Sequence, residues 1–465
     1  MNNSNSFQSF GAAEEVTGSK HLFQFGDKKC LVDCGMFQGH RAETHERNQK
    51  LPFNAADLDA VVLSHGHFDH CGNLPSLNIN GYEGNIYATA ATRDIANLIM
   101  MDSAHIMAKD YEFMRRRHPD KKAYKPIYEE RNVLDTLDLF MTTNYDRKFM
   151  TEAAVSCQFF DAGHILGSSA VVFEHDGGRV AFTGDLGRPG LPILKDPTPL
   201  PPVDYLICEG TYGNRLHDPI EDAKRQLGEV IRNTAERGGK VIIPSFAVGR
   251  TQELVYFLHL LKDEKQIPDG LEIFVDSPMA VNATSIFRVH QECYDEETHR
   301  AFLEHHKNPF GFEGLRYTSD VSESKALNTK QEPCIIISSS GMCEAGRILH
   351  HLKNNITDPR NTVVIVGFMA QHTLGRRIAD REPEVSIFGD KYPLKAQVKI
   401  LNTFSAHADY NDIRDYVQQL DLDRLKRVFL VHGETDALEN LRNVLQHSGV
   451  RDVEIVTRDK RYELA

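Results

Sequence analysis

The sequence lacks the features that mark membrane and secreted proteins. It contains no run of about eighteen consecutive apolar residues, which is the minimum for a membrane-spanning helix. Its first ten residues, MNNSNSFQSF, show no charged segment followed by an apolar one, so no signal peptide is expected. Hydrophobic residues make up 41% of the chain and charged residues 26%, as in ordinary globular proteins. We therefore expect no membrane association, and a length of 465 residues predicts two domains.

Paired cysteines are also missing. The eight cysteines are scattered through apolar runs, and none belongs to a CxxC pair. In a chain of this length, that pattern argues against both a disulfide framework and a cysteine-based zinc site. We expect buried, reduced thiols and a cytoplasmic location.

The chain has no overall excess of positive charge. Its net charge is −13, whereas proteins that bind nucleic acids usually present a basic surface. Bound metal would change this balance, because it adds positive charge where a phosphate binds. One basic stretch also exists, although a solvated helix end and loop is its simpler interpretation. It contains Arg115, Arg116, Arg117, His118, Lys121, Lys122 and Lys125.

The first part of the chain reads mainly as short strands. The β-rich runs at 28–35, 58–65 and 83–89 are bounded by turn-forming residues. Residues 91–117 have apolar positions at helical spacing, and 171–185 predicts a hairpin with Asp-Gly-Gly at its turn.

The rhythm changes from about residue 205 to residue 400. Each β-branched run, beginning with VDYLICEGTYG, precedes a turn containing Gly or Ser and then, in most cases, a helical segment. This order is typical of a parallel sheet with crossover helices, so the fold class is predicted to be α/β.

The hexapeptide HGHFDH carries the strongest chemical signal. His65, His67, Asp69 and His70 directly follow the apolar strand AVVLS. Three imidazoles and one carboxylate in six residues provide the N and O ligands that zinc prefers. A lone histidine is usually an ordinary polar residue, but this cluster after a buried strand predicts a metal site.

Other ligands are needed, because one hexapeptide cannot complete two coordination spheres. His164, Asp185 and His432 each stand at or just after the end of a predicted strand, and Asp33 ends the strand CLVD. The first three are candidate ligands, and Asp33 could orient a ligand through a hydrogen bond. Taken singly, each could be an ordinary loop or capping residue.

These residues resemble those of a known family. HGHFDH, with Asp33 before it and His164 and Asp185 after it, is similar to the metallo-β-lactamase fold. Glu209 in CEGTYG, His407 in SAHAD and His432 in VHGE resemble the additional motifs of the β-CASP nucleases. The resemblance runs from GAAEEVTGS at 11–19 to the last strand.

The resemblance implies a divided domain organisation. It places an αββα metallo-β-lactamase sandwich at 1–207 and 399–465. A β-CASP α/β domain, with a parallel sheet and crossover helices, is inserted at 208–398.

The resemblance also implies a cofactor of two Zn²⁺ ions and a role for each site residue. His65, His67 and His164 hold the first ion, Asp69, His70 and His432 hold the second, and Asp185 bridges both. Asp33 supports the bridging water, and Asp69 and Asp185 belong to the catalytic set. His407, paired with Glu209, is the candidate general acid, and its rival interpretation is a residue in the first turn of a helix.

A weaker prediction concerns substrate phosphates. SSSGM at 338–342 follows a strand and precedes a helix, and two arginines occupy equivalent positions in FAVGRTQE and HTLGRR. Hydroxyl, N–H and guanidinium groups of this kind bind phosphate, although capping and packing explain them equally well. The predicted phosphate contacts are Ser338, Ser339, Ser340, Gly341, Arg250 and Arg376.

The activity implied is hydrolysis of RNA by a hydroxide activated between the metals, with a 5′-phosphate and a 3′-hydroxyl as products. RNA-directed branches of the family resemble this chain in having His at the position of His432, where the DNA-repair branch carries Val. The alternatives are a DNA nuclease, a small-molecule thioester hydrolase, which would not need the inserted domain, and an inactive scaffold, which would lack ligands. The sequence leaves endonucleolytic and 5′-exonucleolytic modes open, allows a homodimer, and assigns no role to residues 105–150.

Overall fold

The computed structural model describes residues 5–39, 41–117, 123–303, 308–367, 369 and 372–464. The chain forms two compact units. Unit 1 contains residues 1–189, 196–216 and 407–465, and unit 2 contains residues 190–195 and 217–406. None of the helices in the described ranges is long and apolar enough to cross a membrane.

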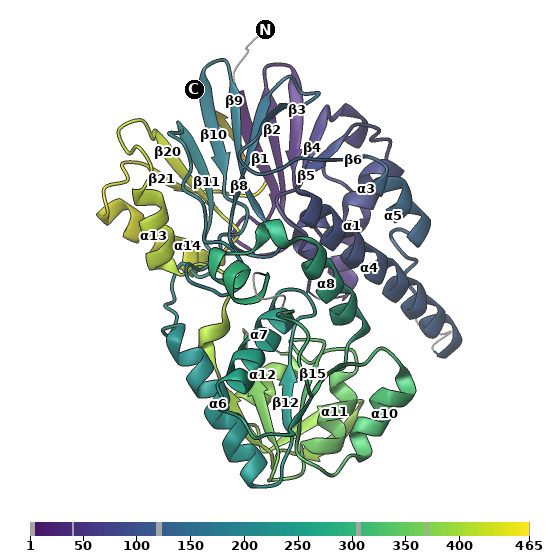
Figure 1. Cartoon of the computed structure of the whole chain (residues 1–465). Coiled ribbons are helices and arrows are strands. Elements are labelled where there is room, and N and C mark those ends of the chain that lie inside the picture. Colours follow the sequence, from purple (N-terminus) through teal and green to yellow (C-terminus); the bar gives the residue numbers. More distant parts are fainter. Residues whose placement is uncertain are drawn as a thin grey trace. The chain divides into compact units, whose positions relative to one another are not determined.

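Unit 1 is built on two seven-stranded sheets (Figure 1). The first has the order β22-β1-β2-β3-β4-β5-β6. Its strands are β1 (Asn5–Gly11), β2 (Lys20–Phe25), β3 (Lys28–Val32), β4 (Ala60–Val62), β5 (Ile86–Ala88), β6 (Phe140–Thr142) and β22 (Arg461–Leu464). The second has the order β21-β20-β11-β10-β9-β8-β7. Its strands are β7 (Lys148–Met150), β8 (Ser156–Asp161), β9 (Ser169–His175), β10 (Gly178–Phe182), β11 (Tyr205–Glu209), β20 (Arg427–Val431) and β21 (Val453–Ile455).

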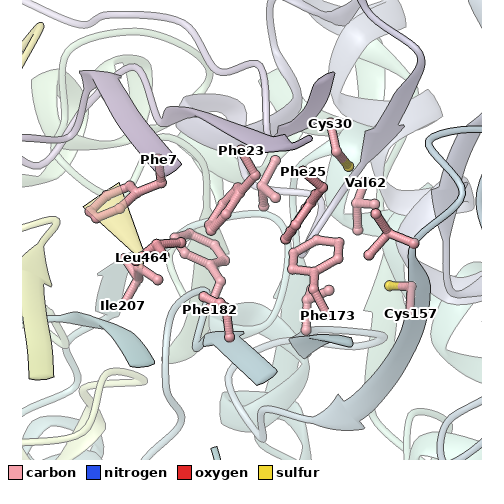
Figure 2. Packing of buried hydrophobic residues seen from close by; sticks show 14 of the residues in the cluster. Phe7, Phe23, Phe25, Cys30, Val62, Cys157, Phe173, Phe182, Ile207 and Leu464 are labelled. Carbon is pink, nitrogen blue, oxygen red and sulfur yellow. The ribbon is translucent and has the colours of Figure 1, made fainter. Parts of the chain in front are cut away.

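The main core of unit 1 lies between these sheets. Phe7, Phe23 and Phe25 of the first sheet pack with Phe173 and Phe182 of the second, as Figure 2 shows. Burial of one phenylalanine side chain contributes about 1.5–3 kcal/mol, so this aromatic layer is a major source of stability.

Helices cover the outer faces of both sheets. The long helix α4 (Ala90–Arg117) packs on the first sheet through Ala96 and Met100. Helices α13 (Tyr410–Gln418) and α14 (Thr435–His447) pack on the second. Strand β20 shows why both faces are apolar: Phe429 and Val431 face the inner core, whereas Val428 and Leu430 face the helices. The predicted αββα arrangement is therefore confirmed.

The remaining helices of unit 1 are short. They are α1 (Arg41–Gln49), α2 (Phe68–Cys71), α3 (Leu74–Ile79) and α5 (Glu130–Leu137).

Unit 2 contains a six-stranded sheet of order β14-β13-β15-β12-β16-β19, in which every neighbouring pair is parallel. Its strands are β12 (Val241–Pro244), β13 (Glu272–Val275), β14 (Leu315–Tyr317), β15 (Cys334–Ser338), β16 (Thr362–Ile365) and β19 (Gln397–Ile400). Helix α6 (Glu221–Glu236) precedes the first of these strands, and the helices between them include α7 (Arg250–Asp263), α8 (Pro278–Val289), α10 (Val321–Thr329), α11 (Ile348–Asn355) and α12 (Leu374–Ala379). A small hairpin joins β17 (Glu384–Ile387) to β18 (Asp390–Pro393). The predicted parallel sheet with crossover helices is confirmed.

Several local predictions match the structure, and one strand differs. The predicted helix at 91–117 is α4, and the predicted hairpin at 171–185 is the antiparallel pair β9–β10. Strand β11, however, does not belong to the sheet of unit 2. It pairs in parallel with β10 and β20 in unit 1. The sequence pattern of such a strand is the same in either sheet, so the sequence could not indicate to which sheet β11 belongs.

Candidate metal centre

A first group of ligand atoms converges at the ends of β4, β8 and β10 in unit 1. His65 and His67 follow β4, His164 follows β8, and Asp185 follows β10. His67 Nδ1 lies 3.1 Å from His65 Nε2 and 3.2 Å from His164 Nε2. The Oδ2 atom of Asp185 lies 3.5 Å from His65 Nε2 and 3.6 Å from His164 Nε2.

A second group lies on the other side of the same carboxylate. His70 Nε2 is 3.1 Å from His432 Nε2 and 3.4 Å from Asp185 Oδ1. Asp69 Oδ2 is 3.4 Å from His432 Nε2 and 4.0 Å from His70 Nε2. The two oxygens of Asp185 therefore face different groups, which is the arrangement of a bridging ligand.

The donor atoms fit metal ions in both places. Zinc bonds of about 2.0–2.2 Å in a tetrahedron place neighbouring ligand atoms about 3.3–3.6 Å apart, close to the separations seen here. The Oδ1 atom of Asp185 is buried without a hydrogen-bond partner, although a buried carboxylate oxygen normally has one. A cation between the groups would satisfy it.

The histidines of the two groups differ in the direction in which their pKa values are shifted. Burial lowers the pKa of His65 well below its usual value and that of His67 to about 4, so both imidazoles are neutral and able to bind metal. Burial also lowers the pKa of His70, but the charges of Asp185 and Asp33 outweigh it and raise that pKa to about 10. The carboxylates around His70 thus stabilise positive charge.

Asp33 contacts His70, one residue of the second group. This carboxylate is fully buried, and its Oδ2 lies 2.7 Å from His70 Nδ1. It also accepts hydrogen bonds from the Ser64 backbone N–H and from the hydroxyls of Ser64 and Ser19. Such contacts fix the orientation of a ligating histidine.

Hydroxyl groups that could not be identified from the sequence also contact residues of the two groups. The Thr211 hydroxyl lies 2.9 Å from His432 Nδ1 and also donates to the His432 carbonyl. The Ser168 hydroxyl accepts from the backbone N–H of His164. Serine and threonine are too common for such partners to be recognised from spacing, although Ser64 immediately precedes the hexapeptide.

A histidine–glutamate pair stands beside the first group. His407 Nδ1 lies 3.2 Å from Glu209 Oε1, and the His407 ring is 4.4 Å from that of His164. An isolated antiparallel β-bridge between Gly187 and His407 holds the backbone of His407 in place. Glu209 is fully buried and accepts hydrogen bonds from the N–H groups of Leu186 and Thr211.

The charges of His407 and Glu209 act on each other. Burial lowers the pKa of His407, but the charge and hydrogen bond of Glu209 outweigh it and raise that pKa to about 9. Burial raises the pKa of Glu209, and the opposing charge of His407 brings it below its ordinary value. Each residue thus favours the charged form of the other. Asp185, Glu209 and His407 also lie close enough to form a third group of potential metal ligands.

The predicted phosphate contacts all lie in unit 2, and most have partners there. The Ser338 hydroxyl donates to the Asp276 carbonyl, and the hydroxyls of Ser339 and Ser277 are 2.9 Å apart. The Ser340 hydroxyl accepts from the N–H groups of Glu344 and Ala345.

The two predicted arginines are ion-paired. Arg250 contacts Glu253, and Arg376 contacts Asp380 at 2.8 Å. In the basic stretch, Arg115, Arg116 and Arg117 are exposed at the end of α4, Lys125 lies beyond the helix, and His118, Lys121 and Lys122 fall outside the described residues.

Comparison with known proteins identifies three regions of the chain. Residues 19–83 match the metallo-beta-lactamase superfamily, residues 251–378 match the Beta-Casp domain, and residues 391–456 match the Zn-dependent metallo-hydrolase RNA specificity domain.

Full-length relatives agree with these matches. Ribonuclease TTHA0252 of Thermus thermophilus is 38% identical, over 95% of this chain and 96% of its own. Transcription termination factor FttA of Methanosarcina mazei is 32% identical, over 93% of this chain and 67% of its own. Cleavage and polyadenylation specificity factor 73 of Drosophila melanogaster is 27% identical, over 94% and 61%.

A solved structure shares the fold. The crystal structure of a protein of unknown function from Enterococcus faecalis V583 superposes with a TM-score of 0.55 at 12% identity, covering 99% of this chain and 100% of that one. Because three regions of the chain match these families, and because one relative is similar to almost the whole chain, this chain belongs to the β-CASP family of the metallo-β-lactamase superfamily.

Proposed function

We propose that this protein is a zinc-dependent ribonuclease that hydrolyses RNA phosphodiester bonds at the centre around Asp185. The observation that carries the proposal is the division of the Asp185 carboxylate between two groups of ligands, with the His407–Glu209 pair beside them. The similarity to a Thermus ribonuclease along nearly the whole chain supports RNA as the substrate, as does the match to an RNA specificity domain.

The ligand groups suit two zinc ions. His65, His67 and His164 would hold one, Asp69, His70 and His432 the other, with Asp185 shared. Two ions held by these residues would lower the pKa of a bound water to near neutrality and stabilise negative charge on the phosphate oxygens.

The side chains of the chain itself manage protons and orientation. With Nδ1 of His407 engaged by Glu209, the protonated imidazole delivers a proton from Nε2 to the leaving oxygen. The product strand then ends in a 3′-hydroxyl, and the other product carries a 5′-phosphate. Asp33 keeps His70 in the orientation needed for ligation, and the Thr211 hydroxyl does the same for His432.

We further propose that the loop at 338–341 contacts a substrate phosphate. The exposed parts of Ser339 and Ser340 support this role, whereas Ser338 is buried and bonded to the Asp276 carbonyl. Arg250 and Arg376 would have to exchange their carboxylate partners for a phosphate. All eight cysteines are buried and none of them forms a disulfide, which fits a reducing, cytoplasmic environment.

The test combines metal analysis with cleavage of labelled RNA and DNA. Wild-type protein should contain zinc and cleave RNA in preference to DNA. The His65→Ala variant should lose both zinc and cleavage, whereas His447→Ala, which changes an exposed histidine of unit 1, should lose neither. A wild-type protein without zinc, or RNA cleavage that survives His65→Ala, would contradict the proposal.

A further inference from the structure

An exposed aromatic side chain stands at the carboxyl end of β12 in unit 2. Phe246 is 47% exposed, although it follows a strand whose residues are all buried. Single exposed hydrophobic residues are common on protein surfaces and mark nothing by themselves. Three further observations distinguish this one.

The backbone at Phe246 is held firmly. Its carbonyl accepts hydrogen bonds from both the N–H (3.2 Å) and the hydroxyl (2.7 Å) of Thr251. On one side, the Ser245 N–H donates to the Ser338 carbonyl at 3.0 Å. On the other, the buried amide of Gln252 donates to the Ala247 carbonyl at 3.1 Å. The ring is therefore presented from a fixed backbone.

The ring lies against the loop that contains the partly exposed Ser339 and Ser340. A Cβ atom added at Gly341 would lie only 2.8–3.1 Å from the Cγ, Cδ2 and Cε2 atoms of Phe246. Glycine thus permits close contact between this side of the ring and the backbone next to Ser340. An aromatic surface therefore lies next to hydroxyl groups. The aromatic surface can stack on the base of a nucleotide, and the hydroxyl groups can bind its phosphate.

The topology of the sheet favours a ligand at the same place. From β12 the chain continues to β13 and β14, which lie toward one edge of the sheet. From β15 it continues to β16 and β19, which lie toward the opposite edge. The neighbouring strands β12 and β15 are therefore the point at which the strand order reverses. Open α/β sheets bind ligands at the carboxyl ends of the strands at such a reversal. Phe246 and Ser339 follow those two strand ends.

We propose that Phe246 is a stacking platform for one nucleobase of a single-stranded RNA substrate. The inference rests on the proposed ribonuclease function and adds a base-binding site to it. Stacking uses the π-face that every base has, so the site tolerates any sequence while requiring an unpaired base. It acts on binding rather than on the chemical step, so Phe246 is a positioning residue.

The experiment uses zinc-loaded protein and labelled single-stranded RNA, either intact or with one abasic nucleotide placed at each position of the RNA in turn. In the wild type, the abasic nucleotide should raise KM at one position by roughly 5-fold to 150-fold, the range for loss of one stacked base. Phe246→Ala should raise KM for intact RNA by a similar factor at unchanged kcat. In that variant the abasic nucleotide should have no further effect at the same position.

Further variants separate stacking from packing. Phe246→Trp should retain the wild-type KM, whereas Phe246→Leu, which keeps an apolar contact with Gly341, should behave like Phe246→Ala. Phe388→Ala removes another exposed phenylalanine of unit 2 (53% exposed) and should leave KM unchanged. Zinc content and melting temperature are measured for every variant.

Two results would overturn the inference. One is an unchanged KM in both Phe246→Ala and Phe246→Leu. The other is an equal loss on intact and abasic RNA at every position, which indicates a purely structural role. Zinc-loaded wild-type protein that fails to cleave RNA would instead refute the ribonuclease proposal, so the two failures are distinguishable.

Discussion

Nδ1 of His407 lies 3.2 Å from Oε1 of the buried Glu209, although 198 positions separate the two residues in the chain. Glu209 is the last residue of β11, an interior strand of the second sheet, and the bridge to Gly187 brings His407 beside it. Two backbone N–H groups hold the carboxylate, so its orientation does not depend on the histidine. This relationship leads directly to two predictions.

The first prediction concerns His407→Ala. If His407 supplies the proton for the leaving oxygen, the variant should keep its zinc and lose about 10²–10⁴-fold in kcat, the usual contribution of general acid catalysis. Metal analysis and RNA cleavage are measured on the same preparation. Because Asp185, Glu209 and His407 could also hold an ion, loss of zinc from this variant would show that His407 is a ligand instead.

The second prediction concerns the pH dependence of Glu209→Gln. Glu209 is the main cause that raises the pKa of His407 to about 9 against the effect of burial. A proton donor is active while protonated, so activity falls as the pH rises through its pKa. Without the glutamate charge that pKa falls, and the alkaline limb of kcat/KM should move to lower pH. An alkaline limb identical to that of the wild type would contradict the role of the pair.

The sequence predicted the fold well because the pattern of apolar residues within one strand or helix is local. The run in β20, for example, reveals a strand buried on both faces, and the hexapeptide at 65–70 concentrates ligands within one loop. Contacts between distant hydroxyls and site residues have no such local signal. The hydroxyl of Thr211 meets His432 across 221 positions, and that of Ser19 meets Asp33 across 14. Which oxygen of Asp185 faces which histidines is likewise a property of the folded backbone alone.

Asp33→Asn is expected to weaken metal binding without unfolding the chain. The amide keeps the size of the carboxylate but loses its charge and one acceptor, so His70 is held less firmly. Partners of ligating histidines are typically worth about 10–100-fold in metal affinity. Zinc affinity is measured by competition with a chromophoric chelator. Asp27→Asn, which changes an exposed carboxylate in the same unit, should leave the affinity unchanged, and equal affinities for both variants would contradict the prediction.

Gly35→Ala tests the close packing behind the ligand loop. A Cβ at this position would lie 1.5 Å from the Asp69 carbonyl oxygen and 2.0 Å from its carbon, so the backbone that carries Asp69 and His70 must shift. We expect destabilisation of about 3 kcal/mol, at the upper end of the usual range for overpacking, together with weaker zinc binding. Urea unfolding measures the first effect. Gly178→Ala is the control, since its nearest neighbour would be 3.5 Å away.

The last prediction concerns acid stability and His21, a fully buried residue on β2. Its Nδ1 lies 2.7 Å from the Ser9 hydroxyl, and its Nε2 has no hydrogen-bond partner. Burial lowers the pKa of His21 from 6.5 to about 3. Between these two pH values the unfolded chain binds more protons than the folded one, so stability falls as the pH drops below 6.5. At pH 5 the loss from this one residue is about 2 kcal/mol.

His21→Gln removes the titrating group, so the free energy of unfolding should fall less between pH 7 and pH 5 in this variant than in the wild type. Urea unfolding at both pH values, in excess zinc, gives the two differences. The histidines of the candidate metal centre are present in both proteins, so their contributions cancel in the comparison. His447→Gln, which changes an exposed histidine, should follow the wild type. If His21→Gln were as acid-sensitive as the wild type, the buried imidazole would not be the group that titrates, because only a residue held neutral in the folded state produces this slope.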